Sequence, residues 1–100
     1  MAGAQLQRQA TGHYLLNGEL SFATATELLT LGRVQFAGQL SVDVDLSGVT
    51  HADSAGLALL LEWLRWARQQ GQQLRYHAAP AQLHALASIS EVEDLLADRA

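Results

Sequence analysis

The chain has 100 residues, enough for one hydrophobic core and too few for two, so we expect a single domain over residues 1–100. Hydrophobic residues make up 49% of the sequence and charged residues 16%, a composition typical of folded rather than disordered chains. A formal net charge of −4 with only six basic residues argues against a nucleic-acid partner, and the absence of cysteine excludes disulfides and zinc–thiolate sites.

No segment has the pattern of a targeting or membrane-spanning element. The opening residues, MAGAQLQRQATGH, lack the apolar stretch of a signal peptide. The longest apolar run, residues 55–61, is too short to cross a bilayer. We therefore expect a cytoplasmic protein that does not insert into a membrane.

The first part of the chain predicts two strands and a helix. Residues 13–20, HYLLNGEL, form the first clear strand, and a weaker candidate lies around residues 6–9. The Asn-Gly pair at 17–18 is a hairpin-turn signal, but the apolar run after it is too short to pair, so we expect a bulge or a strand end there. The capping box Thr24-x-x-Glu27 predicts the start of a helix that continues through Leu28, Leu29 and Leu31.

Residues 40–46 alternate between apolar and polar side chains, which predicts a strand with one buried and one polar face. The inward positions of this strand are Leu40, Val42, Val44 and Leu46. Its polar face carries Asp43 and Asp45, and with Asp53 these carboxylates could hold a magnesium ion. Alternating Asp residues more often mark a solvated strand face, and that is the interpretation we prefer.

The second part of the chain predicts a long helix, a strand and two short helices. The long helix begins at about Ser54 and should end at Gly71, a glycine in the position that follows a helix C-cap. A strand over residues 74–79 comes next, and Pro80 suits the first turn of a helix that carries Leu83, Leu86 and Ala87.

The capping box Ser90-x-x-Glu93 predicts a last helix with Val92, Leu95 and Leu96. The order ββαβαβαα is typical of an α/β domain, here a small mixed sheet backed by helices. No cofactor or metal is predicted.

The segment HADSAG, residues 51–56, places a histidine, an aspartate and a serine within four positions and suggests a serine hydrolase. A nucleophile elbow needs glycines two residues before and two after the serine. Ser54 is followed by Gly56 but preceded by Ala52, and the remaining histidines are scattered along the chain at His13, His77 and His84. Since no proton relay is indicated, we predict no catalytic residue.

The same segment is better explained as the start of a helix. Asp53 or Ser54 is the N-cap, and open backbone amides and the positive end of the helix dipole are expected around the Ser54 hydroxyl. Gly56 leaves room for another backbone or a phosphate to approach closely. Ser54 is therefore a candidate docking point and a candidate phosphorylation site, where a phosphate would add about two negative charges.

The helix from Ser54 has two apolar stripes when its residues are placed at 100° intervals. The first, a core stripe, consists of Leu57, Leu60, Leu61, Leu64 and Ala67. The second consists of Leu59, Trp63 and Trp66, and the side that faces water carries Glu62, Arg65 and Gln69. A surface helix needs only one apolar face, so either a neighbouring helix of the same domain or a partner protein must cover the second stripe.

These segments resemble the signature of the STAS domain family, the fold of anti-sigma-factor antagonists. The resemblance rests on VDLSGV at 44–49 and DSAGL at 53–57, and NGEL at 17–20 matches the family's early strand. The order of elements fits from about residue 5 to residue 96. The resemblance implies that Ser54 occupies the position of the family's regulatory Ser/Thr. The family usually has a further strand after the third helix, for which this sequence offers little beyond Ile89.

Within the family, the chain is most similar to the MlaB type, the small cytoplasmic STAS subunits of phospholipid-trafficking ABC transporters. That similarity rests on DSAGLALLL at 53–61, WL at 63–64 and ARQQG at 67–71. It implies a non-enzymatic subunit that binds the transporter's ATPase, supports outer-membrane lipid asymmetry and associates with the inner membrane through that complex.

A second interpretation stays open inside the same family. MlaB-type proteins can carry threonine in the motif, and a serine there also suits an anti-sigma-factor antagonist that a kinase switches by phosphorylating Ser54. Under either interpretation, the residues expected to bind the partner are Asp53, Ser54, Ala55, Gly56, Leu59, Trp63 and Trp66.

Overall fold

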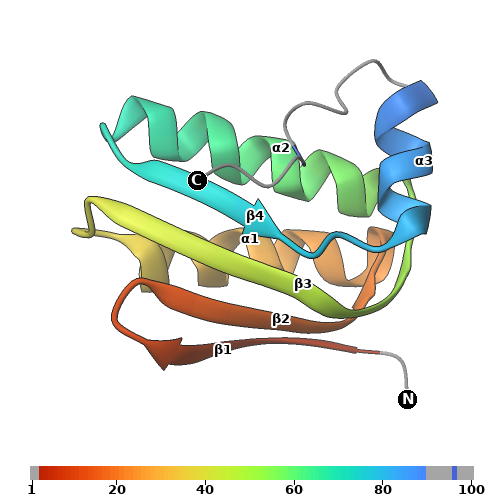
Figure 1. The fold of residues 1–100 in the computed structure, drawn as a ribbon, viewed down its shortest axis with the longest axis horizontal. Coiled ribbons are helices and arrows are strands. Elements are labelled where there is room, and N and C mark those ends of the chain that lie inside the picture. Colours follow the sequence, from red (N-terminus) through yellow and green to blue (C-terminus); the bar gives the residue numbers. More distant parts are fainter. Residues whose placement is uncertain (1–2, 90–95, 97–100) are drawn as a thin grey trace.

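A four-stranded mixed sheet forms the centre of the computed structural model, which describes residues 3–89 and residue 96. The strands are β1 (Ala4–Ala10), β2 (His13–Leu20), β3 (Ser41–Ala52) and β4 (Gln73–His77), and the helices are α1 (Phe22–Phe36), α2 (Ser54–Gln69) and α3 (Ala81–Ile89). The strand order is β1-β2-β3-β4, with β1 antiparallel to β2 and the other neighbours parallel (Figure 1). The predicted α/β class with a small mixed sheet is confirmed.

One face of the sheet is buried beneath α1 and α2. Both helices connect neighbouring parallel strands, and right-handed crossovers place two such helices on the same face. Side chains along the strands alternate accordingly, and the inward set is buried: Tyr14, Leu16, Val42, Val44, Leu46, Leu74 and Tyr76. The third helix, α3, stands at the carboxyl-terminal ends of the parallel strands β2, β3 and β4 (Figure 1).

Trp63 of α2 holds the two long helices together. Its indole is fully buried, packs edge-on against Phe36 at a centroid distance of 5.2 Å, and lies where a Cβ on Gly32 would be. Its Nε1 donates to the carbonyl oxygen of Leu29 at 3.3 Å. Helix α1 therefore covers much of the second apolar stripe, since Leu59 and Trp63 are buried and only Trp66 of that stripe is half-buried.

Helix α1 starts earlier than the sequence pattern predicted. Its N-cap is Ser21, whose hydroxyl accepts the Ala23 N–H at 3.2 Å. The Thr24 hydroxyl accepts the Ser21 N–H in return at 3.0 Å, so Thr24 is the third helical residue of a capping box that opens at Ser21. The prediction that a box at Thr24-x-x-Glu27 opens this helix is wrong.

Strand β3 is displaced and longer than predicted. It begins at Ser41, and Leu40, expected to point inward, is 85% exposed. Strand β3 continues to Ala52 because it stays paired with β2 from the His13–Asp43 pair to the Leu20–Ala52 pair. A bulge or a strand end was expected at the Asn-Gly pair 17–18, and β2 does not end there but continues to Leu20. The β2–β3 register shifts on both sides of the pair, but the extra residues belong to β3.

The predicted end of α2 at Gly71 is confirmed. Gly71 has φ of +70°, the Gly71 N–H donates to Arg68 O at 3.1 Å, and the Gln72 N–H donates to Ala67 O at 2.8 Å. These two bonds form a Schellman motif, which only a residue in the left-handed conformation can close.

The predicted strand at 74–79 corresponds to β4, and the predicted helix after Pro80 corresponds to α3, which begins at Ala81. The capping box predicted at Ser90-x-x-Glu93, with Val92 and Leu95, lies outside the described residues, whereas Leu96 is buried. Within the part of the chain that the structure describes, no helix is both long and apolar enough to cross a membrane.

Candidate functional site

The segment 51–56 lies at the edge of the sheet where the parallel strands end and the helices begin. Strand β2 leads through Ser21 into α1, and β3 leads through Asp53 into α2. Because β2 and β3 are parallel neighbours, helices α1 and α2 begin at the same edge of the sheet (Figure 1). Their first residues are Phe22 and Ser54.

Asp53 is the N-cap of α2, which decides between the two candidates that the sequence left open. Its Oδ1 accepts the N–H groups of Ala55 at 2.9 Å and Gly56 at 3.0 Å. Its Oδ2 accepts the N–H of Phe22, the first residue of α1, at 3.3 Å. The hydrogen bond from Gly56, with those from Phe22 and Ala55 and the charge of His51, outweighs desolvation and lowers the pKa of Asp53 below its ordinary value.

Gly56 is required by a close approach between α2 and β2. A Cβ at this position would overlap the carbonyl oxygen and Cβ of Leu20. The sequence predicted room here for another backbone or a phosphate, and the structure fills that room with the chain's own strand end. The Asp53 N–H donates to the same Leu20 carbonyl oxygen at 3.0 Å, so the turn is fixed to β2 from two sides.

Ser54 is the first helical residue of α2, and its side chain is exposed. The expectation that open amides surround its hydroxyl is wrong, because the Asp53 carboxylate already binds the Ala55 and Gly56 N–H groups. Among the described residues, Ser54 has no hydrogen bond to a histidine, and His51 Nδ1 instead lies 3.4 Å from Gln82 Nε2. The hydrolase arrangement weighed from the sequence is therefore not assembled in the described part of the chain.

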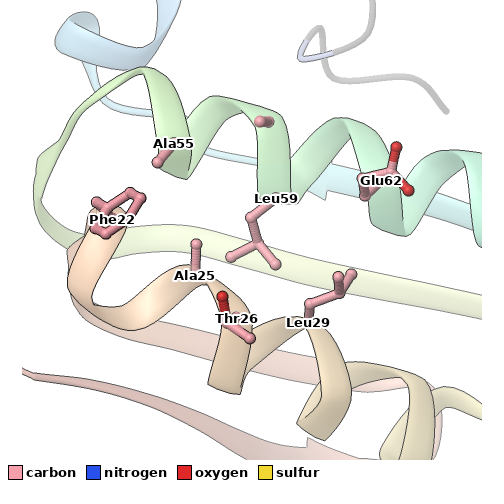
Figure 2. Close-up of a pocket in the computed structure, with 8 residues that line it drawn as sticks. Phe22, Ala25, Thr26, Leu29, Ala55, Leu59 and Glu62 are labelled. Carbon is pink, nitrogen blue, oxygen red and sulfur yellow. The ribbon is translucent and has the colours of Figure 1, made fainter.

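An apolar groove of about 240 Å³ lies between α1 and α2 and is lined by Ala55, the residue that follows Ser54 (Figure 2). We call it the α1–α2 groove; it is lined by Phe22, Ala25, Thr26, Leu29, Ala55, Ala58, Leu59 and Glu62. Phe22 stands at its mouth, near Ala55 in Figure 2, and is 86% exposed. Exposure of a large aromatic side chain beside an apolar groove is a mark of an interaction surface.

The predicted partner-binding residues divide into two groups. Asp53 to Gly56 form the first turn of α2, and Leu59 lines the groove one turn further on. Trp63 lies in the core behind the groove and Trp66 is half-buried further along α2, so neither lines the groove.

Sequence reasoning missed Phe22. The available signal was an aromatic residue directly after a Ser N-cap, with Ala25, Thr26 and Leu29 following at helical spacing.

A second polar cluster occupies the outer face of the sheet. Asp43 Oδ1 lies 2.7 Å from His77 Nε2 and 3.1 Å from Arg75 Nε, and Asp43 Oδ2 lies 3.8 Å from His13 Nδ1. The Asp43 side chain is only 16% exposed, because these partners shield it on a sheet face that the helices leave uncovered. In the described ranges, no three His, Cys, Asp or Glu side chains are placed to hold a metal ion, and Asp43, Asp45 and Asp53 do not converge.

Burial raises the pKa of Asp43. The hydrogen bond from His77 and the charges of Arg75, His77 and His13 outweigh this effect, so the pKa lies below the ordinary carboxyl value.

Comparison with known proteins assigns the chain to a family. The sequence matches the family model described as "Mlab, STAS domain" over residues 5–97. The chain belongs to the STAS domain family. The curated proteins contain no significant match to this STAS domain.

Solved structures share the fold at low sequence identity. The unphosphorylated anti-sigma factor antagonist SpoIIAA is 14% identical with a TM-score of 0.73, over 97% of this STAS domain and 88% of that chain. The phosphorylated form of the Bacillus cell-fate determinant SpoIIAA is 13% identical with a TM-score of 0.69, over 97% and 91%.

The murine anion transporter Slc26a9 is also similar, at 16% identity and a TM-score of 0.64. The match covers 91% of this STAS domain and 18% of the transporter chain. These likenesses show the fold.

Proposed function

We propose that this STAS domain is a non-enzymatic subunit that binds the ATPase of a phospholipid-trafficking ABC transporter. The observation that carries the proposal is the exposed Ser54 turn beside the α1–α2 groove, with Phe22 86% exposed at its mouth. Through this complex the domain would stand at the cytoplasmic side of the inner membrane and support lipid asymmetry of the outer membrane. The domain itself would not enter the bilayer.

The chemistry of the turn favours binding over catalysis. The Asp53 carboxylate caps α2, and its bonds to the Ala55 and Gly56 N–H groups leave those amides unavailable to an oxyanion. Among the described residues, no base is hydrogen-bonded to the Ser54 hydroxyl, and the adjacent groove is apolar. An exposed apolar surface next to a hydroxyl suits protein docking, where aromatic anchors contribute much of the affinity.

The choice of partner rests on the match to the MlaB-type family model, which spans residues 5–97. A subunit of this type would offer the first turn of α2 and the α1–α2 groove to the ATPase. Asp53, Ser54, Ala55, Gly56 and Leu59 then belong to the contact or support it directly. Trp63 would act from behind by holding α1 against α2, and half-buried Trp66 would lie at the margin of the contact.

A second candidate function is that of an anti-sigma-factor antagonist. It is favoured by the likeness in fold to SpoIIAA, whose phosphorylated and unphosphorylated forms are both among the similar structures. Ser54 is exposed, as a kinase substrate must be. A phosphate there would place about two negative charges beside the Asp53 carboxylate and would change the docking surface.

The test is direct binding of the purified domain to the ATPase subunit of the host's phospholipid transporter, measured by calorimetry and gel filtration. We expect a stable complex that Phe22→Ala weakens. The matched control is Ile89→Ala, because Ile89 is also 81% exposed but lies on α3, outside the groove. Binding to an anti-sigma factor, with none to the ATPase, would select the second function. Esterase or phosphatase turnover that Ser54→Ala abolishes would overturn both.

A further inference from the structure

The two walls of the α1–α2 groove are helices α1 and α2. Different side chains hold these helices together at the two ends of the groove. At the far end, Trp63 lies against Gly32, and its Nε1 donates to Leu29 O at 3.3 Å. At the mouth, where both helices begin, the Asp53 carboxylate reaches both walls. The packing of a buried indole fixes the far end, whereas the half-buried Asp53 carboxylate holds the mouth.

The Asp53 carboxylate divides its oxygens between the walls. Oδ1 accepts the N–H groups of Ala55 and Gly56 and caps α2, whereas Oδ2 accepts the Phe22 N–H of α1 at 3.3 Å. Phe22 and Ala55 are the first residues of the two walls to line the groove (Figure 2). One side chain therefore contacts the backbone at the start of each wall.

The bond from Phe22 to Asp53 is not needed to cap α1. Ser21 already caps that helix, since its hydroxyl accepts the Ala23 N–H and its own N–H is bound by Thr24. The Thr24 and Ala25 N–H groups both donate to Ser21 O, at 3.0 and 2.9 Å. The hydrogen bond from the Phe22 N–H to Asp53 Oδ2 instead fixes the position of α1 relative to α2.

We propose, on the basis of the binding function above, that Asp53 is a positioning residue for the docking surface. Its Oδ2 bond to Phe22 fixes the spacing of the groove mouth, and partner binding needs this bond in addition to the Oδ1 cap on α2. If the groove mouth already has the spacing that the partner requires, less conformational entropy is lost when the partner binds. Losing the bond should weaken binding by about tenfold without unfolding the domain.

Asp53→Asn separates the two roles of the carboxylate. An asparagine keeps one carbonyl oxygen, which can cap α2, because Asn is as good an N-cap as Asp. Its second group is an NH₂, which donates and cannot accept the Phe22 N–H. Asp53→Ser is a second variant that keeps a capping oxygen and is too short to reach α1. The matched control is Ser21→Ala, which removes the α1 cap and keeps the Asp53 bond.

The readouts are the Phe22 amide proton signal, the through-space contact between the Phe22 ring and the Ala55 methyl group in NMR spectra, and affinity for the purified ATPase. In both Asp53 variants we expect the Phe22 amide to lose protection, the ring–methyl contact to weaken and the affinity to fall about tenfold. Ser21→Ala should lower the melting temperature and leave the affinity unchanged. A purely structural role for Asp53 would not separate affinity from stability in this way.

An unchanged Phe22–Ala55 contact in Asp53→Asn would overturn the positioning role, and so would unchanged affinity with the Phe22 amide released. If the wild-type domain does not bind the ATPase, the proposed function fails. The amide and methyl signals still decide, in that case, whether Asp53 sets the spacing of the walls.

Discussion

Asp43 Oδ1 lies 2.7 Å from His77 Nε2, and this contact joins β3 to β4 on the face of the sheet that the helices leave uncovered. The parallel register explains the contact. Asp43 pairs with Arg75 and Asp45 with His77, so His77 lies diagonally across from Asp43 on the same face. His13 of β2 is in register with Asp43 from the other side. One partly buried carboxylate thus receives side chains from both neighbouring strands.

We expect Asp43→Asn to lower the free energy of unfolding by about 1 kcal/mol at pH 7, the size of a partly exposed ion pair. The pKa of Asp43 is lowered in the folded state, so its contribution is fully present above the unfolded carboxyl value of about 3.9. That contribution is lost as the pH falls through the folded-state pKa. Urea unfolding of both proteins between about pH 7 and pH 2 should therefore show two stability curves that converge in acid.

Asp45→Asn is the control for this pair of curves. Asp45 lies two residues along the same strand face and accepts the Ser47 N–H at 2.8 Å, and it forms no ion pair among the described residues. Its replacement should cost less at pH 7 than that of Asp43. Curves for wild type and Asp43→Asn that stay parallel down to pH 2 would show that the ion pairs do not stabilise the fold.

Trp63→Ala should lower the free energy of unfolding by about 3–5 kcal/mol, because the fully buried indole fills the space between Gly32 and Phe36. Trp66→Ala is the matched control in the same helix, and its cost should be smaller since Trp66 is half-buried. Thermal and urea unfolding measure both. Equal costs for the two variants would contradict the assignment of Trp63 to the α1–α2 contact.

Gly56→Ala should destabilise the domain by roughly 1–3 kcal/mol, even though alanine is the better helix former. The added Cβ would overlap Leu20 O, which belongs to the backbone and cannot rotate away. Ala58→Gly, at an exposed position two residues along the same helix, measures the effect of helix propensity and should cost about 1 kcal/mol. A stabilising Gly56→Ala would show that α2 does not approach β2 this closely.

Local patterns predicted most of the fold correctly. The strand pattern in 13–20, the glycine at 71 and the order of strands and helices correctly predicted β2, the end of α2 and the α/β class. The start of α1 was misplaced because both Ser21 and Thr24 can cap a helix, and the observed box uses both hydroxyls at once. The choice between them depends on where β2 ends, which is a tertiary property.

The details of the site depended on contacts between residues far apart in the sequence. The Asp53 cap on α2 was one of two local candidates, but its bond to Phe22 spans 31 positions and follows from β2 and β3 being parallel neighbours. The same holds for Asp43 and His77, which are 34 positions apart. Periodicity assigns a residue to a face of a strand or helix, but it does not give the register between strands that brings such pairs together.

Removal of the Ser54 hydroxyl should scarcely change stability. The structure gives the N-cap role to Asp53, so Ser54→Ala should stay within about 0.5 kcal/mol of the wild type in urea unfolding, as other surface substitutions do. Asp53→Ala in the same experiment should cost about 1 kcal/mol, since it removes the cap. A larger loss of stability for Ser54→Ala than for Asp53→Ala would show that Ser54 is the N-cap.

Ser54→Glu should give a folded domain that no longer binds its ATPase partner. A carboxylate in the first turn of α2 interacts favourably with the helix dipole, by about 0.3–1 kcal/mol, which offsets its repulsion from Asp53 and leaves the melting temperature close to that of the wild type. In a packed interface beside the apolar groove, the longer charged side chain would lose its water and clash with the partner. Binding is measured by calorimetric titration of the ATPase with two control variants. Ser88→Glu places the same charge on an exposed position of α3, and Ser54→Thr keeps the hydroxyl. Both controls should bind the ATPase as the wild type does. Equal affinities for the wild type, Ser54→Ala and Ser54→Glu would remove this turn from the interface.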